Sequence, residues 1–335
     1  FKRYYDYNYK LSIKHEEMTD EYFLYTMMLK TKHYLTDAVK KRMMSERPVG
    51  CLLSGGLDSS LITALVSKYY TKAPLQTFSI GLEGSEDLKY ARKVADYLGT
   101  EHHELVVSEK DMLNFIETDI VQIESYDTTT VRASVPMLML CKYIREKTDV
   151  IVIYSGEGSD EASGSYLYFH NAPSPAEFQN ECVRLIEDLN RFDVLRCDKS
   201  TAGAGLEVRV PFLDKAFLEH YMSVPAEMKV PKDGMEKWFL RKAFEDEKML
   251  PSEVLWRTKD GMSDGCSSKT KPWYSIIQDY VDTVISDEEF EASKSKYKHN
   301  PPKIKESLYY RKIFDKHYPG QAHLTPYYWL PKWSG

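Results

Sequence analysis

The chain has 335 residues, enough for one large domain or two ordinary ones. Its 51 acidic and 45 basic side chains give a net charge of −6, so composition alone gives no general attraction to nucleic acid or to a membrane surface. No apolar run approaches the roughly 20 residues that span a bilayer. Five widely spaced cysteines without a Cys-x-x-Cys pair fit a reducing compartment and predict packing thiols. We therefore expect a cytoplasmic protein with neither a nucleic-acid nor a membrane partner.

Apolar positions recur at helical spacing near the start of the chain. They predict a helix from Thr19 to about Arg47, with Thr19 or Asp20 as its cap and Pro48 as its stop. Apolar runs typical of strands follow, and amphipathic stretches typical of helices separate them. The predicted strands cover residues 49–53, 76–82, 102–107 and 149–155, and the predicted helices include residues 61–69, 91–99 and 136–148.

This alternation predicts an α/β protein with a doubly wound parallel sheet that helices cover on both faces. After Gly164 the pattern is mainly helical, with few strand candidates, so we expect an α-helical C-terminal layer packed on the sheet. Residues 1–48 are interpreted as a linker and helix, and residues 49–335 as the functional domain.

Two polar loops follow predicted strands. Ser-Gly-Gly-Leu-Asp-Ser-Ser at 54–60 follows the first strand, and Ser-Gly-Glu-Gly-Ser-Asp-Glu at 155–161 follows the fourth. Ligands of such sheets bind where the strand order reverses. If strands one and four are neighbours at that point, the two loops face each other across the site.

The first loop offers backbone N–H groups and serine hydroxyls at a helix N-terminus, which suit an anion such as pyrophosphate. It lacks the Lys-Ser/Thr ending of the common phosphate loop. The alternative interpretation is a tight turn in which Asp58 or Ser59 caps the helix. Asp58 and Asp160 together could hold Mg²⁺, although either aspartate alone is more often a cap.

Six segments together carry a resemblance to a known family. They are SGGLDSS at 54–60, ESYDTTTVRAS at 124–134, SGEGSDE at 155–161, YLYFH at 166–170, LEVRVPFLD at 206–214 and WRTKDGMSDG at 256–265. From about residue 20 to 333 the chain resembles the synthetase domain of the glutamine-hydrolysing asparagine synthetases. These are pyrophosphate-loop ATP enzymes with the adenine nucleotide alpha hydrolase-like fold. The resemblance implies amidation of aspartate through β-aspartyl-AMP, with ATP, Mg²⁺ and ammonia, releasing AMP and pyrophosphate.

The resemblance also implies roles for individual residues. Lys259 serves the phosphates and Glu157 is the base that takes a proton from ammonia. The alternative for Lys259 is a solvated surface lysine. The alternative for Glu157 is a loop carboxylate that is bonded to backbone amides. The remaining positions are Ser54, Gly55, Gly56, Asp58, Ser59 and Ser60 for pyrophosphate and its Mg²⁺, Asp160 for the same metal, and Leu53, Ile80, Ser155 and Gly156 for adenosine.

Four charged residues are candidates for aspartate recognition. The segment 206–214 places charges inside an apolar stretch, where buried charge needs a partner. A structural ion-pair network explains them equally well, and both interpretations stay open. The candidates are Asp193, Arg196, Glu207 and Arg209.

Some positions depart from the family pattern without removing a named catalytic group. They are Asn171, Cys197, residues 203–205 and Asp260. The adjacent His102 and His103 point to opposite faces of a predicted strand, which favours structural histidines over a metal site. The closing aromatics, which include Trp329 and Trp333, are interleaved with prolines, and we interpret them as packing residues.

The full family enzyme carries a glutaminase domain whose first residue is a nucleophilic cysteine. Here the first residue is Phe1, so we expect that domain to be missing from this chain and to belong to the same full-length polypeptide. A homodimer is possible. Two alternatives remain, namely a related adenylating ligase such as a β-lactam synthetase, and a catalytically silent nucleotide-binding module.

Overall fold

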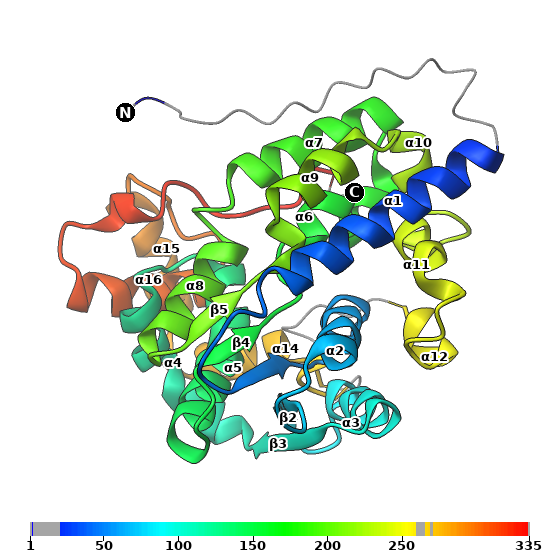
Figure 1. Ribbon diagram of the computed structural model, residues 1–335. Coiled ribbons are helices and arrows are strands. Elements are labelled where there is room, and N and C mark those ends of the chain that lie inside the picture. The colour runs from blue at the N-terminus through cyan, green and yellow to red at the C-terminus, as the bar shows by residue number, and fades with distance from the viewer. Residues whose placement is uncertain (1, 3–20, 259–264, 269–270, 334–335) are drawn as a thin grey trace.

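The computed structural model describes residues 2, 21–258, 265–268 and 271–333, and it contains one parallel sheet with the strand order β3-β2-β1-β4-β5 (Figure 1). Successive strands lie to one side of β1 and then to the other, so the order reverses between β1 and β4. The predicted neighbourhood of the first and fourth strands is therefore confirmed. The strands are β1 Val49–Leu52, β2 Gln76–Leu82, β3 Glu101–Val107, β4 Val152–Tyr154 and β5 Glu207–Arg209.

Helices connect the strands and make up most of the chain after β4. The helices before β4 are α1 Glu21–Lys40, α2 Leu57–Tyr69, α3 Glu86–Leu98, α4 Glu109–Ile123 and α5 Thr128–Lys147. Those after β4 are α6 Ser159–Ser163, η2 Leu167–Asn171, α7 Pro175–Glu187, α8 Asp193–Gly203, η3 Pro211–Leu213, α9 Lys215–Ser223, α10 Ala226–Lys229, α11 Trp238–Glu245, α12 Ser252–Leu255, α14 Trp273–Val284, α15 Asp287–Lys296, α16 Lys305–His317 and η4 Ala322–Leu324. Within the described ranges, no helix is both long enough and apolar enough to cross a membrane.

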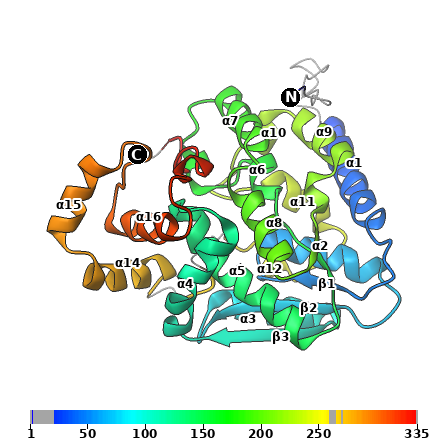
Figure 2. The same cartoon turned by 90° about the vertical axis from the view of Figure 1, so that its left-hand side faces the viewer.

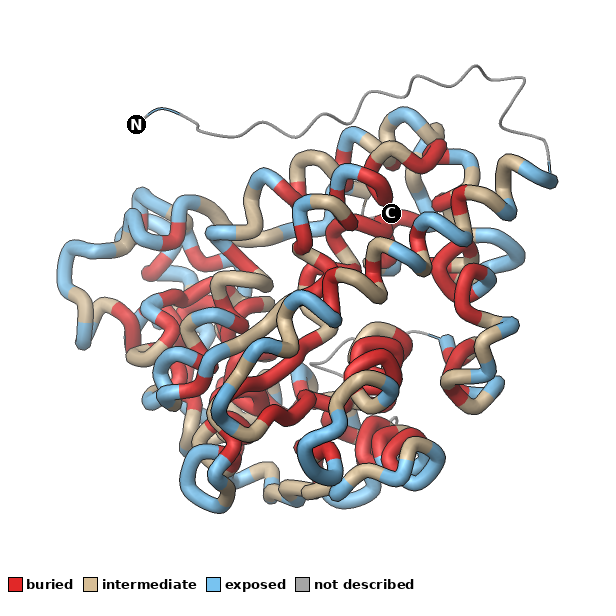
Figure 3. The backbone as a smooth tube through the Cα atoms, in the orientation of Figure 1, coloured by how far each residue is buried: buried red, intermediate tan, exposed pale blue. Residues whose placement is uncertain are grey.

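Helices cover both faces of the sheet because its strands are apolar on both sides. Cys51 and Leu53 belong to one core cluster with residues of α2 and α3. Leu52 and Ile153 belong to another, with residues of α5 and α8. Figure 3 shows these buried residues concentrated in the strands and the helices against them. The doubly wound α/β fold that the sequence predicts is confirmed.

The C-terminal half is helical, as predicted, but its helices form two separate groups (Figure 2). Helices α7, α9 and α11 share a core with α1, α2 and the adjacent face of the sheet. Helices α14 and α16 share a core with α4 and α5 instead. The second group therefore packs mainly on helices and reaches the sheet only at the ends of β2 and β3, through Leu82 and Val107.

Several elements differ from the sequence prediction: α3 begins earlier and β4 is shorter than expected, and three others differ more. Helix α1 ends at Lys40, before the expected stop, and turns precede β1. Helix α5 begins at Thr128 and passes through Pro136, because Asp127 caps its N-terminus and burial against neighbouring helices outweighs the proline's cost. The three-residue strand β5 was not predicted, since its sequence, Glu-Val-Arg, has charges on both sides of a single apolar residue.

Helix α1 packs against α2, α9 and α11, so it is part of the same folded body as the sheet. The domain boundary at residue 48 stays a prediction.

We expect Ile153→Ala to lower the free energy of unfolding by about 2–5 kcal/mol, because the substitution leaves a cavity at a fully buried position of β4. Val106→Ala on β3 is the matched control, since Val106 is 55% exposed. Chemical denaturation of both variants measures the difference. Equal losses would contradict the assignment of Ile153 to the central core.

Candidate active site

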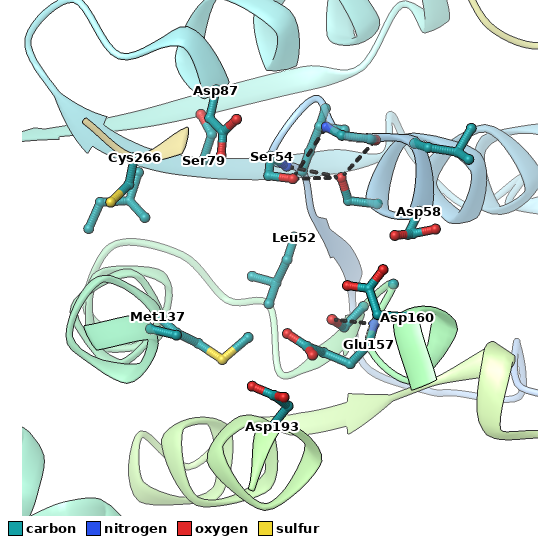
Figure 4. Close-up of a pocket in the computed structure, with 18 of the residues that line it drawn as sticks. Leu52, Ser54, Asp58, Ser79, Asp87, Met137, Glu157, Asp160, Asp193 and Cys266 are labelled. Atoms are coloured by element: carbon teal, nitrogen blue, oxygen red, sulfur yellow. Dashed lines mark hydrogen bonds between the residues drawn. The ribbon is translucent and has the colours of Figure 1, made fainter. Parts of the chain in front are cut away.

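The loops after β1 and β4 touch each other at the point where the strand order reverses. A Cβ atom on Gly156 would lie 2.7 Å from the backbone carbon of Asp58 and 2.7 Å from the backbone nitrogen of Ser59. No side chain fits between the two loops at this position. The predicted face-to-face arrangement is therefore a direct backbone contact (Figure 4).

The first loop holds its shape through its own serines. The Ser54 and Ser59 hydroxyl oxygens lie 3.0 Å apart, and the Gly56 N–H donates to Ser54 Oγ at 3.3 Å. Gly55 has φ 72°, a left-handed conformation that favours glycine, and it packs against the backbone of α3. The N-cap of α2 is Gly56, without a side-chain cap bond, and not Asp58 or Ser59. The helix N-terminus therefore keeps N–H groups that its own cap residue does not occupy.

A buried lysine joins the two loops. Lys237 Nζ bonds Asp58 Oδ2 of the first loop, and it bonds Asp160 Oδ1 of the second loop at 2.5 Å. Its side chain is only 2% exposed. Burial alone would lower the pKa of Lys237, but Asp160 and Asp58 outweigh burial and raise it above its ordinary value. Lys237 therefore carries its positive charge inside the site.

The backbone at Lys237 is unusual. The residue has φ 57° and ψ 24°, and it is the N-cap of α11. A left-handed conformation costs energy for a side-chain-bearing residue, and such conformations cluster at functional sites. This geometry aims the lysine toward the two aspartates.

The two aspartates fit a divalent cation in their chemistry. Both side chains are partly accessible, and both point toward the same positive charge. Carboxylates plus substrate phosphate oxygens are the ligand set that Mg²⁺ prefers. No group of three or more His, Cys, Asp or Glu side chains within the described ranges could hold a metal. A cation at Asp58 and Asp160 would thus need oxygens from a ligand.

An acidic cluster lies beside this pair. Arg196 Nη2 donates to both oxygens of Glu157, at 3.0 and 3.1 Å, and lies 3.8 Å from Asp193. The Tyr166 hydroxyl lies 2.8 Å from Asp193 Oδ2 and 3.1 Å from Glu161 Oε1. The residues come from the loop after β4, from α6 and α8, and from the start of η2, which Tyr166 precedes.

Burial and mutual repulsion raise the pKa values in this cluster. Burial raises the pKa of Glu157, Arg196 opposes the rise, and Asp193 adds to it. Burial together with Asp193 and Asp160 raises the pKa of Glu161 to about 8. A carboxyl with a raised pKa is a better proton acceptor at neutral pH than an ordinary one.

A cavity of about 320 Å³ lies at the carboxyl ends of β1 and β4, next to this cluster. Of the site residues predicted from the sequence, those that line it are Leu53, Ser54, Gly56, Asp58, Ser59, Ile80, Ser155, Gly156, Glu157, Asp160, Asp193 and Arg196. Apolar residues of α5, among them Met137 and Leu140, complete its wall. The volume lies in the range typical of small-molecule sites.

Of the predicted site residues that the structure describes, Gly55, Ser60, Glu207 and Arg209 are not among those that line the cavity. Gly55 packs against the backbone of α3 and Ser60 is fully buried, while Lys259 lies outside the described residues. Arg209 pairs with Glu207 at 2.8 Å and donates to the backbone oxygen of Met44 at 2.9 Å. These contacts tie β5 to the segment after α1, which matches the structural alternative for that pair.

Other residues line the cavity that the sequence interpretation did not assign to it. No sequence motif marks Lys237, and other lysines lie nearby in the sequence. Only the fold therefore identifies it as a residue of the site. Tyr166 and Arg257 lie in two of the quoted segments, where a role could have been sought. Arg257 pairs with Asp87 at 3.0 Å, and both reach the cavity. Trp329 reaches it from the C-terminal end of the chain.

The structural interpretation of the histidines and cysteines is confirmed. His102 lies 2.9 Å from Thr77 Oγ1 and 3.1 Å from Ser79 Oγ, whereas His103 stacks on Phe78. All five cysteines are buried and form no disulfide.

The raised pKa of Glu161 predicts a pH-dependent stability. The native state keeps this proton to higher pH than the unfolded chain, so the stabilising contribution is complete in acid and is lost as pH rises toward about 8. Glu161→Gln carries no charge at any pH. As the pH rises from about 5 to about 8.5, wild type should lose this contribution and the variant should not. The denaturant midpoint of the variant should therefore rise relative to that of wild type over this range. A difference that does not change with pH in denaturation experiments would contradict this account.

Comparisons with known proteins agree with this geometry. The asparagine synthase family matches residues 30–181 and 171–334. Asparagine synthetase [glutamine-hydrolyzing] of Gallus gallus is 53% identical over 301 residues, which cover 89% of this chain and 54% of that protein. The Cricetulus griseus protein of the same name is 49% identical over 322 residues, 95% of this chain and 57% of its own length. The chain thus spans about half the length of the curated relatives it matches.

Among solved structures, NMN synthetase from Francisella tularensis is similar over 92% of this chain and 98% of its own, with 12% identity. Its TM-score of 0.35 is too low to support an argument about function. The sequence match over nearly the whole described chain, with the strand-end loops and their aspartates in one cavity, is decisive: the chain belongs to the asparagine synthase family.

Proposed function

We propose that this chain amidates L-aspartate to L-asparagine in an ATP-dependent reaction through β-aspartyl-AMP, with release of AMP and pyrophosphate. The observation that carries the proposal is the buried Lys237 held between Asp58 and Asp160 where the loops after β1 and β4 meet. This arrangement suits a polyphosphate and its metal, and a base and an arginine lie in the same cavity.

ATP would bind along the carboxyl ends of β1 and β2. The loop 54–60 and the N-terminus of α2 would hold the β- and γ-phosphates through N–H groups and serine hydroxyls. Leu53 and Ile80, with the backbone of Ser155 and Gly156, would hold the adenosine part. Pyrophosphate held as a unit is a leaving group, which fits a loop without the lysine of γ-phosphoryl-transfer enzymes.

In the first step, an oxygen of the aspartate side-chain carboxylate attacks the α-phosphorus of ATP. The bond from that phosphorus to the bridging oxygen breaks, and pyrophosphate leaves with the electron pair. Lys237, and Lys259 by resemblance, would stabilise the negative charge that accumulates on the phosphates. Mg²⁺ held by Asp58 and Asp160 would supply further charge neutralisation on the phosphate oxygens.

In the second step, ammonia attacks the acyl carbon of β-aspartyl-AMP and AMP leaves. Attack by a neutral amine generates an N–H proton that must be removed, and Glu157 is the proposed acceptor. Its raised pKa suits that role, and its ion pair with Arg196 fixes its direction.

Asp193 and Arg196 are the proposed contacts for the amino-acid substrate. Both line the cavity next to Glu157, and they offer one negative and one positive group to the ammonium and carboxylate of aspartate. Glutamine-dependent synthesis would require a glutaminase domain to supply ammonia. The buried, reduced cysteines fit the proposed cytoplasmic location.

The decisive assay follows AMP and asparagine formed from aspartate, MgATP and ammonium chloride by the purified chain. We expect the two products in equal amounts, because each adenylate consumed yields one of each. Aspartate-dependent exchange of labelled pyrophosphate into ATP tests the first step alone. Absence of both product formation and exchange would overturn the proposal and favour a silent nucleotide-binding module.

Glu157→Gln separates the two steps. Amide formation should fall by about 100-fold or more, because the base is lost, while pyrophosphate exchange should change far less. Glu157→Gln keeps the side-chain shape and an acceptor for Arg196, so a loss of structure is minimised. Equal losses in exchange and in asparagine formation would instead indicate a positioning role for Glu157.

A further inference from the structure

The last described segment of the chain returns across the molecule to the candidate site. We name residues 325–333 the C-terminal strap. It follows α16 and η4, which lie against α4 and α5, and it ends beside η2 (Figures 1 and 2). The strap therefore links the third helical layer to the loop region after β4.

Specific bonds hold the strap along its whole length. Thr325 O accepts from Asn300 Nδ2 at 2.7 Å. The Trp329 N–H donates to Asp127 Oδ1 at 2.8 Å, and Trp333 O accepts from Asn171 Nδ2 at 3.3 Å. Three bonds from different elements give this segment one defined course.

Asp127 couples the strap to the wall of the cavity. One of its oxygens accepts from the Thr130 N–H and caps α5, and the other accepts from Trp329. Helix α5 supplies Met137 and Leu140 to the cavity. The position of Trp329 is thus fixed to the same helix that forms the apolar wall.

Trp329 is among the residues that line the cavity, and its ring packs on Tyr166. The two ring centroids lie 5.4 Å apart in an edge-on arrangement, and the Tyr166 hydroxyl bonds Asp193 at 2.8 Å. Trp333 belongs to the same strap but packs on Tyr168 and Phe169, and it is not among the residues that line the cavity.

We propose that Trp329 is a positioning residue for the amino-acid substrate, which orients Tyr166 and through it the carboxylate of Asp193. The proposal rests on the proposed function. It adds that a residue of the C-terminal strap helps to position the amino-acid substrate. An indole against the phenol ring restricts the rotation of Tyr166, so that its hydroxyl stays directed at Asp193.

The location favours an effect on the amino acid over an effect on the nucleotide. Figure 4 shows Asp193 and Glu157 on the side of the pocket opposite Ser54 and Ser79, which belong to the β1 and β2 end where the nucleotide is proposed to bind. Trp329 reaches the cavity on the Asp193 side, through its contact with Tyr166. Loss of the indole therefore disturbs the amino-acid end first.

The test compares Trp329→Ala, Trp329→Phe and the control Trp333→Ala in steady-state kinetics with ammonium chloride. Trp329→Ala should raise the KM for aspartate about 3- to 10-fold, the equivalent of one lost aromatic pair. The KM for ATP should stay within about 2-fold, because the nucleotide end is not touched. Trp329→Phe should recover most of the loss, since a smaller ring still packs on Tyr166. Trp333→Ala should leave the KM for aspartate at the wild-type value.

A double-mutant cycle tests whether Trp329 acts through Tyr166. Tyr166→Phe removes the hydroxyl that holds Asp193, so adding Trp329→Ala to it should raise the KM for aspartate little further. A full multiplication of the two single effects would overturn the mechanism. Trp329→Ala could instead raise the KM for aspartate and the KM for ATP equally, or Trp333→Ala could have an equally large effect. Either result would show that Trp329 has only a general structural role and would overturn the inference.

A binding measurement separates failure of this inference from failure of the proposed function. Tryptophan fluorescence of the wild-type chain is titrated with aspartate in the presence of Mg²⁺ and α,β-methylene-ATP, a probe that cannot release pyrophosphate. If the wild-type chain is active and Trp329→Ala has the same KM for aspartate, the inference is overturned and the proposed function stands. A wild-type chain that neither makes asparagine nor binds aspartate overturns both.

Discussion

The ammonium of Lys237 between Asp58 and Asp160 is the interaction on which the site depends. Two carboxylates from different loops repel each other at short range, and a buried cation between them turns that repulsion into attraction. Removing one member of such a buried group leaves an uncompensated charge, which is strongly destabilising. The loop after β1, the loop after β4 and the start of α11 are therefore held in one fixed arrangement.

The backbone contact at Gly156 adds a steric constraint to this electrostatic one. The loops approach so closely that only a residue without a side chain fits at that position. The parallel sheet makes the contact possible, because the strand order reverses between β1 and β4 and both strands end at the same edge. The strand order thus places the two loops side by side, Gly156 permits their backbone contact, and Lys237 neutralises the two aspartates.

The surrounding cluster balances opposite charges in a buried setting. Arg196 satisfies Glu157 and lies near Asp193, while Tyr166 supplies a hydroxyl to Asp193 and Glu161. Burial and like charges raise carboxyl pKa values here, and the arginine limits the rise for Glu157. The site therefore keeps a charged network near a cavity without fully exposing it to water. Such perturbed groups are typical of places where protons are transferred.

Local pattern alone determined much of this protein. The strand-like runs, the loops after the first and fourth strands and the pair Asp58 and Asp160 were predicted from short segments, because these features depend on neighbours in sequence. The role of Glu157 came from the family resemblance instead. The tertiary structure alone decided the rest. Lys237 lies 77 residues from Asp160 in the chain, and no periodicity marks a contact at that separation. Strand β5 is too short and too charged to show a pattern, and its pairing with β4 forms it. The sequence predicted Trp329 as a packing residue, and only the course of the last segment brings this residue to the cavity, because long-range packing determines where a chain end lies.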